Sequence, residues 1–283
     1  MTPYRQTQHI ISQVYLKQFG FKDNTGKNWI SVWELGSEYT DNKSIKSFLA
    51  EENIFDLPFK NLKERRKFEE LNGDIETYYP KIISDLNNGQ KLSEKSKANL
   101  ISIIINLLCR TKSFRNQIDF LLQSDKRDYF LNEITNYHGP FRNQLKHSLT
   151  RFRLDDQVNL VLFSVWYYFC KKLTSSNFDY VILKDFSNRG WITSDNPVVI
   201  KDNINEVTLL AQETEIFFPI SPKYLFYLDH MDYNRSRSLR VKGQELTQSS
   251  DDLHRYFTDI IWRNAEQYVI FPNYIEKTKL SKT

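Results

Sequence analysis

The chain has 283 residues, 40% of them hydrophobic and 14% aromatic, with 39 basic and 35 acidic residues for a formal net charge of +4. This composition supplies a sizeable core and excludes a disordered or fibrous chain. The small basic excess permits contact with nucleic acid without requiring it, because dedicated binders concentrate charge on one face. The densest basic clusters, Lys60–Lys67 and Arg235–Arg240, are interpreted as solvated surface.

Cellular location is predicted from the cysteines and from the absence of targeting segments. Cys109 and Cys170 both lie in apolar segments, as reduced core cysteines of a cytoplasmic protein do. The start of the chain, MTPYRQTQH, is too polar for a signal peptide. The longest apolar run, Val158–Cys170, is shorter than the roughly 20 residues of a membrane span. We therefore expect a cytoplasmic protein without a membrane partner.

Helical patterns dominate the first two thirds of the chain. Apolar residues between 10 and 19 recur at helical spacing, residues 28–35 read as a strand, and residues 36–60 read as irregular chain with a short helix at 47–52. Four more helices are predicted: 64–71, 73–86 with a kink or a split at Pro80, one long helix from Ser93 to about Gln123, and 128–134, ended by His138-Gly139-Pro140. Asp155 or Asp156 then opens a buried helix to Leu173.

The pattern changes to that of strands from about residue 178. Predicted strands are 178–183, 190–193, 197–201, 206–210, 215–220, 224–228 and 267–271, with a helix from Asp251 or Asp252 to about Asn264. We predict a single α+β domain over residues 1–283, helical at about 60–175 and mainly β at about 178–273. Its central helical bundle packs with a mostly antiparallel C-terminal sheet, which the N-terminal strand is free to join.

The long helix carries a polar arc of small and amide side chains. Within about 100° of its helical wheel fall Asn99, Ser102, Asn106, Cys109, Arg110, Ser113 and Gln117. Arg110 is the one charge in the arc, and Arg115 projects from nearly the opposite side. The arc is interpreted either as an ordinary solvent face or as the wall of a cleft.

Several motifs with defined chemistry are absent. The sequence has no HExxH, no cysteine pair, no P-loop, no GxGxxG and no GxSxG. This argues against a conventional zinc site, a P-loop or Rossmann nucleotide site, and an α/β-hydrolase. Glu69, Glu70 and Glu76 on neighbouring helices can hold a divalent cation through oxygen ligands, although acidic helix surface is the commoner outcome.

The stretch GWITSDNPVVI, residues 190–200, interrupts an apolar strand with polar residues. Asp195 and Asn196 favour a turn through side-chain bonds to the local backbone, and Pro197 sets φ. An aspartate at the end of a buried strand is also where a rigid element places a catalytic carboxylate. Both interpretations stay open on the sequence.

Five blocks in chain order resemble one protein family. They are His9 with Tyr15, Leu16 and Phe19; Arg110-Thr111 with Arg115; Trp191-Ile192-Thr193-Ser194-Asp195-Asn196-Pro197; Phe218-Pro219-Ile220-Ser221-Pro222; and Asn264. Together they resemble the DUF4238 family, a mainly bacterial group of unknown function, over nearly the whole chain. Ser12 departs from the Pro common in that family. The resemblance implies no activity, but it implies a shared polar site between the N-terminal segment, the long helix and the C-terminal sheet.

Two function classes follow from these residues. The first is a bacterial nuclease or phosphodiesterase, in phage defence or as a toxin. Arg110 would bind phosphate, His9 would be general acid or base, and Asp195 would orient His9 or bind Mg²⁺ or Mn²⁺ with Glu76. Arg115, Ser194, Asn196 and Asn264 would bind the substrate.

The second class is a non-catalytic protein of such a system that senses a ligand or binds a protein partner. Its polar cluster would then be a ligand pocket or a structural network. In a purely structural role, Arg110 would neutralise Asp195 inside the fold. Nucleic acid or a nucleotide is the expected partner of the first class. In both classes Asp195 is expected to face Arg110 or His9.

Overall fold

The computed structural model describes residues 5–136, 154–175, 178–201, 214–230 and 246–273, with a few single positions outside these ranges. The helices are α1 Gln13–Phe19, α2 Leu62–Arg65, α3 Lys67–Glu76, α4 Tyr79–Asn87, α5 Glu94–Arg110, α6 Lys112–Gln123, α7 Arg127–Asn136, α9 Leu154–Ser175 and α11 Asp251–Arg263. The strands are β1 Thr7–His9, β2 Phe21–Lys22, β3 Asn28–Glu34, β4 Thr40–Ser44, β5 Ala50–Glu52, β6 Phe178–Lys184, β7 Thr193–Ser194, β8 Val199–Lys201, β9 Glu215–Ser221, β10 Tyr224–His230, β11 Leu246–Gln248 and β12 Tyr268–Phe271. This is the predicted α+β class.

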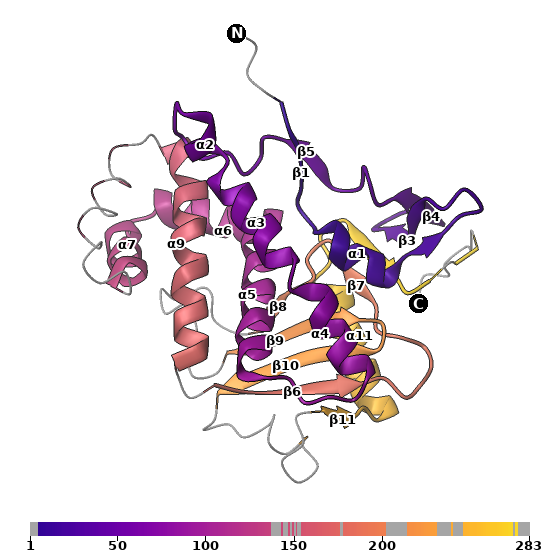
Figure 1. Ribbon diagram of the computed structural model, residues 1–283. Helices are drawn as coiled ribbons and strands as arrows, with labels where there is room; N and C mark the ends of the chain where they lie inside the picture. The colour runs from indigo at the N-terminus through magenta and orange to yellow at the C-terminus, as the bar shows by residue number, and fades with distance from the viewer. Residues whose placement is uncertain are drawn as a thin grey trace.

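One sheet, in the order β11-β6-β10-β9-β8, forms the middle layer of the molecule. It is antiparallel except for β11, which runs parallel to β6. Side chains alternate between its faces, as the two-residue period of a strand requires. Ile182 and Phe226 pack with the helices that Figure 1 shows crossing one face, whereas Val181 and Tyr227 pack with Phe257 of α11 on the other. Because both faces are covered, β6 is nearly continuously apolar.

A second sheet joins the two ends of the chain. Its order is β2-β3-β12-β7, with β4 on the other edge of β3. The C-terminal strand β12 therefore lies between β3 and β7 and is antiparallel to both. The N-terminal strand therefore pairs with a C-terminal strand, but in a sheet separate from the central one, and this shared sheet brings the N-terminal segment beside the strand that precedes Asp195.

Aromatic packing fixes α1 against β7 and β9. The Tyr15 hydroxyl lies 2.5 Å from Oγ1 of Thr193, and the Tyr15 ring stacks on Phe218 with 5.2 Å between centroids. The neighbouring Tyr79 hydroxyl donates to the carbonyl of Ile220. Burial raises the pKa of both tyrosine hydroxyls well above the usual value, so both remain protonated.

The 190–200 stretch starts at a position that only glycine suits well. Gly190 has φ of +74°, and a Cβ atom there would lie 3.1 Å from the Pro272 ring. Trp191 follows and is fully buried, stacked on His254 of α11 at 4.5 Å between ring centroids. This anchor holds the start of β7 rigidly between α11 and β12.

Three predictions about local structure are wrong, and one strand was missed. Residues 36–60 contain β4 and β5 rather than irregular chain and a short helix, because pairing with β3 and β1 orders them. The helix predicted from Gly73 does not start there, since Gly73 lies inside α3, and the break before Pro80 falls at Thr77–Tyr78. The strand β11 was not predicted. The predicted long helix is two helices, because Thr111 adopts ψ of 147° between α5 and α6 and its hydroxyl caps α6 through the Phe114 N–H.

Some predictions fall on residues outside the described ranges. These are the strand at 206–210, the basic cluster Arg235–Arg240 and the helix end at His138-Gly139-Pro140. Within the described part of the chain, no helix combines the length and the apolar character needed to cross a bilayer.

Candidate functional site

Arg110, the last residue of α5, lies at the centre of a buried polar network. Its side chain is 2% exposed. Its Nη1 donates to Oε1 of Glu76 at 2.7 Å and to Oδ1 of Asn106 at 3.4 Å. Its Nε and Nη2 both donate to the main-chain carbonyl of His9. Every nitrogen of the guanidinium group therefore has a partner within the protein, and four of its five N–H donors are engaged there.

Around Asn106, the polar arc of α5 packs against α3 and does not line a cleft. Asn106 donates to Oδ1 of Asn72 at 2.7 Å, and Asn72 donates to Oε2 of Glu69 at 3.1 Å. Both asparagines are 1% exposed. Asn72 was missed by the sequence reasoning, although its place one turn before Glu76 on α3 is a usable signal. The network ties α3, α5 and β1 together.

Glu69 ends this network, and its ionisation is disfavoured there. Burial raises the pKa of its carboxyl above the usual value, opposed by the charge of Arg110 and the hydrogen bond from Asn72. An acid whose folded-state pKa is raised contributes stability that is present below the unfolded value and lost as pH rises through the folded value.

We therefore expect the Glu69→Gln variant to unfold at a higher urea concentration than the wild type at pH 7. Its midpoint should also vary less between pH 4 and pH 7, because the glutamine oxygen still accepts from Asn72 but carries no charge to bury. Urea titrations across this pH range test this, with Glu70→Gln on the exposed side of α3 as the control. An unchanged pH profile in Glu69→Gln would contradict the assignment.

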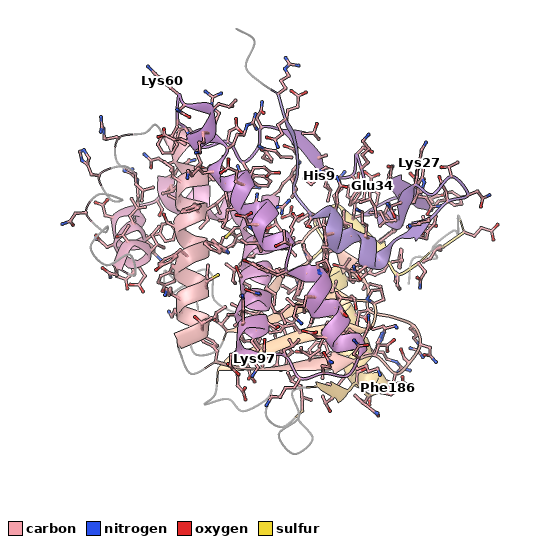
Figure 2. The ribbon with its side chains drawn as sticks, in the orientation of Figure 1. His9, Lys27, Glu34, Lys60, Lys97 and Phe186 are labelled. Atoms are coloured by element: carbon pink, nitrogen blue, oxygen red, sulfur yellow. The ribbon has the colours of Figure 1, made fainter. Side chains whose placement is uncertain are left out.

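His9, labelled in Figure 2, meets Arg110 through its main chain rather than its ring. The ring Nε2 lies 2.9 Å from the carbonyl of Lys46 and 2.9 Å from Nε2 of Gln13. The imidazole therefore serves to join β1 to the segment after β4. The structure brings His9 and Arg110 together, but it does not place the imidazole against the guanidinium.

Asp195 faces neither Arg110 nor His9, so that expectation is wrong. Its Oδ1 accepts from the Glu266 N–H at 3.0 Å and its Oδ2 from the Gln267 N–H at 2.7 Å. Asp195 is 8% exposed, and this burial raises the pKa of its carboxyl despite the main-chain hydrogen bonds. The turn between α11 and β12 supplies these donors, because β12 pairs with β7 and brings residues 266–267 opposite Asp195.

The neighbours of Asp195 in the motif also bond to main chain. The Ser194 hydroxyl, fully buried, accepts from the Asn196 N–H at 3.1 Å. The Asn196 side chain donates to the carbonyl of Asn264 at 3.2 Å. Asn196 and Asn264, both predicted to bind substrate, therefore do meet in space, while Ser194 is inaccessible.

Arg115 and Arg110 approach the same aromatic ring, although the single-helix wheel puts them on opposite sides. Their Cζ atoms lie 5.7 Å and 5.4 Å from the Phe55 ring centroid. Arg115 also donates to Oδ1 of Asn159 at 2.7 Å, and burial lowers the pKa of its guanidinium. The bend at Thr111 causes this convergence by changing the direction of the helix between the two arginines.

A groove runs between α6 and the turn that follows α11. It comprises two cavities of about 340 Å³ and 80 Å³, and some of the residues that line one are chain neighbours of residues that line the other. Consecutive residues line them: Lys112 and Asp195 face the larger cavity, and Ser113 and Asn196 face the smaller one. We call this the α6 groove. It lies between the N-terminal segment, helices α5 and α6, and the C-terminal strands. The sequence predicted a polar site in this region.

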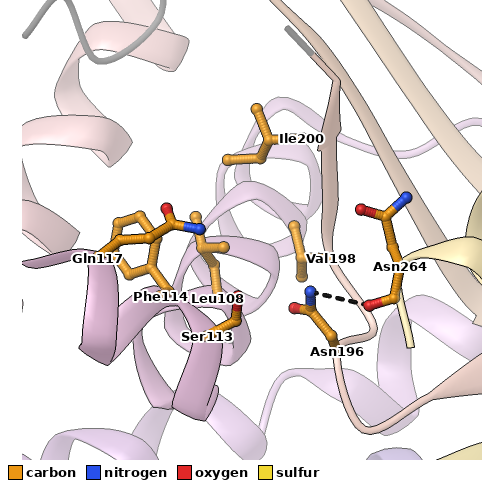
Figure 3. A pocket seen from close by; sticks show the side chains of 8 residues that line it. All are labelled: Leu108, Ser113, Phe114, Gln117, Asn196, Val198, Ile200 and Asn264. Carbon is orange, nitrogen blue, oxygen red and sulfur yellow. Dashed lines mark hydrogen bonds between the residues drawn. The ribbon is translucent and has the colours of Figure 1, made fainter. Parts of the chain in front are cut away.

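The smaller cavity of the α6 groove is lined by polar side chains and by apolar side chains, three of which are almost completely buried. Figure 3 shows Gln117 and Ser113 on α6 facing Asn196 across it. The apolar side chains are Leu108 and Phe114 on the helical side and Val198 and Ile200 on the strand side, with Asn264 at the edge. Ser113 and Gln117 belong to the predicted polar arc, so the cleft-wall interpretation holds for its α6 part.

The two predicted metal ligands, Glu76 and Asp195, have different hydrogen-bond partners in the protein. Glu76 accepts from Arg110, whereas Asp195 accepts from two main-chain N–H groups. Among the described residues, no group of three or more His, Cys, Asp or Glu side chains is arranged to hold a metal ion. The binding of Mg²⁺ or Mn²⁺ by Asp195 with Glu76 stays a prediction.

The protein therefore combines an α+β fold with buried, hydrogen-bonded polar groups around Arg110 and Asp195, and the α6 groove lies beside them. The family model described as protein of unknown function (DUF4238) matches residues 7–273. The chain therefore belongs to the DUF4238 family, as the motif resemblance indicates. No curated protein and no solved structure matches the chain.

Proposed function

We propose that this protein binds a nucleotide, or a closely related phosphate ester, in the α6 groove and holds it without cleaving it. The main support is that the three residues predicted to be catalytic already have hydrogen-bond partners inside the protein. Arg110, Asp195 and the His9 ring all find their partners inside the protein. A general acid or a phosphate-binding arginine needs donors free at the reacting atoms. These residues therefore brace the groove.

Lys112 is the residue that we propose contacts the phosphate. It is the one cationic side chain among the described residues that line the groove. It stands in the first turn of α6, where the helix dipole also favours an anion. Its ion pair with Glu51, 2.6 Å long, is half exposed and correspondingly weak. Asp195 and Glu266 add negative charge to the same cavity, so the phosphate has to approach from the α6 side.

The test is calorimetric titration of the purified chain with AMP, ATP and short oligonucleotides. We expect nucleotide binding that Lys112→Ala weakens by about tenfold, the effect of losing one charge-assisted hydrogen bond. Lys27→Ala, in an exposed turn (Figure 2), is the matched control and should bind as the wild type does. Failure of every nucleotide to bind, or equal binding by Lys112→Ala, would overturn the proposal.

A nuclease or phosphodiesterase is the second candidate, and one observation favours it. Lys112 and Asp195 face the same cavity, and Ile10, next to His9, lines it too. A cation, a carboxylate and a nearby imidazole are groups that phosphoryl-transfer sites use. Chromatography of nucleotides and oligonucleotides incubated with Mg²⁺ or Mn²⁺ separates the candidates. Cleavage that His9→Ala abolishes without lowering the melting temperature would favour the hydrolase and reject a holding role.

A further inference from the structure

We infer that the Glu51 carboxylate competes with the phosphate of the ligand for Lys112 and thereby lowers the affinity of the α6 groove. This role rests on the proposed function, because it concerns the same phosphate contact. It follows from three observations: the ion pair between Glu51 and Lys112, the positive charge around that pair, and the main chain that presents Glu51.

The ion pair places a carboxylate where a phosphate would bind the lysine. Oε1 of Glu51 lies 2.6 Å from Nζ of Lys112. Within the described part of the chain, neither side chain has a second hydrogen-bond or ion-pair partner. A phosphate oxygen forms the same charge-assisted contact with an ammonium group. Glu51 and Lys112 are 43% and 52% exposed, so Glu51 can turn into water without leaving a buried charge behind.

Positive charge is concentrated around the Glu51 carboxylate. Lys112 and Arg115 are three residues apart on α6 and are therefore neighbours on its surface. Burial lowers the pKa of the Arg115 guanidinium, and the charge of Glu51 opposes this change, so Glu51 acts on both cations. The first turn of α6 adds the positive end of the helix dipole. Because the same field attracts any anion, the position that Glu51 takes is also favourable for a phosphate.

The main chain of β5 holds Glu51 in this position. It pairs with β1, where Glu51 lies opposite Gln8. The residues on both sides of β5 adopt left-handed backbone, Leu49 with φ of +49° and Asn53 with φ of +59°. Leucine is rare in that region, and such strain is often found at ligand sites. Leu49 also lines the larger cavity, and its carbonyl accepts from the Ile10 N–H at 2.9 Å. Only the Glu51 side chain therefore has to move to release Lys112.

Calorimetric titration of the full chain with AMP tests the competition. We expect Glu51→Gln to bind AMP about two- to fivefold more tightly than the wild type, the effect of removing one exposed ion pair. The matched control is Glu52→Gln, because the next side chain of a strand points to the other face and Glu52 pairs with Arg5 at 3.6 Å instead. Glu52→Gln should bind AMP as the wild type does. Equal AMP affinity in Glu51→Gln and the wild type would overturn the competition and leave the phosphate contact of Lys112 standing.

A double variant separates competition from simple repulsion between charges. In the Lys112→Ala background, Glu51→Gln should no longer raise the affinity for AMP, because the contact for which the two anions compete is gone. Adenosine, which lacks the phosphate, should also gain nothing from Glu51→Gln. A gain of the same size in the Lys112→Ala background or with adenosine would overturn the competition, since Glu51 would then act without Lys112 or without the phosphate.

The outcomes distinguish this role of Glu51 from the proposed function. Binding of AMP that depends on Lys112 but not on Glu51 would reject the competition alone. Binding of AMP by Glu51→Gln and not by the wild type would support the competition and the phosphate contact together. Absence of nucleotide binding in both proteins, with melting temperatures unchanged, would reject both.

Discussion

Replacing Arg110 with alanine is expected to destabilise the protein by about 3–5 kcal/mol, the range observed when one partner of a buried ion pair is removed. Glu76 would keep its negative charge without a counter-ion, and the His9 carbonyl would lose both donors. Urea unfolding followed by circular dichroism at pH 7 measures this loss. The large effect arises because the side chain is almost completely excluded from water.

Two further variants serve as controls for the Arg110→Ala measurement. Arg263→Ala removes a similar ion pair, with Asp259, but both side chains there are more than half exposed, so the loss should be below about 1 kcal/mol. Glu76→Gln retains an acceptor for Arg110 and should lose less than Arg110→Ala. If Arg110→Ala stays as stable as Arg263→Ala, Arg110 does not brace the fold, and the phosphate-binding role becomes the better explanation.

Replacing Asp195 with alanine is expected to destabilise the protein by about 2–4 kcal/mol. The main-chain N–H groups of Glu266 and Gln267 would each lose a charged acceptor, at about 1–3 kcal/mol per unsatisfied donor. Asp195→Asn should lose less, because its one remaining oxygen still satisfies one of the two donors. Urea unfolding of both variants gives this order directly.

The control for Asp195 is an aspartate on the surface. Asp259→Ala removes a carboxylate that pairs with Arg263 on an exposed helix face and should change stability by less than about 1 kcal/mol. If Asp195→Ala matched Asp259→Ala in stability and lost a ligand or an activity instead, Asp195 would be a functional group rather than a brace. The predicted order of losses is Asp195→Ala, then Asp195→Asn, then Asp259→Ala.

The two braces explain why the motif residues occur together without forming one site. Arg110 holds α5 to β1 and α3, and Asp195 holds β7 to the turn before β12. Between these two fixed points lie Lys112, Ser113 and Gln117 on one side and Asn196 on the other. The buried residues therefore set the width of the α6 groove, and the partly exposed residues beside them are the ones that can contact a ligand.

Segments whose side chains repeat with a clear period were predictable from the sequence. The strands β6, β9 and β10 and the helices α9 and α11 appear close to their expected bounds, because burial on one or both faces leaves a regular apolar pattern. The N-terminal strand β3 was found in the same way. Local turn chemistry also predicted that the chain bends at Asp195–Asn196.

Segments whose structure depends on a distant partner were not predictable. The strand β4, TDNKS, has little strand preference of its own and is ordered by hydrogen bonds to β3. The break at Thr111 carries no Gly or Pro, and a threonine between two apolar stretches is compatible with one continuous helix. Because of the ψ angle at Thr111, a helical wheel drawn for one continuous helix gives wrong directions for side chains after Arg110. The Arg115 side chain therefore lies over the Phe55 ring.

The sequence by itself determined the α+β class, the central sheet strands, the family and the set of polar residues that belong together. Only the tertiary structure decided what those residues face. The sequence allows an ion pair between Asp195 and Arg110. In the structure, β12 pairs with β7, and this pairing places two main-chain N–H groups within hydrogen-bond distance of Asp195 instead. The physical reason is that a buried carboxylate takes whichever donors the strand pairing places within hydrogen-bond distance, and pairing between residues 194 and 269 leaves no trace in the local sequence.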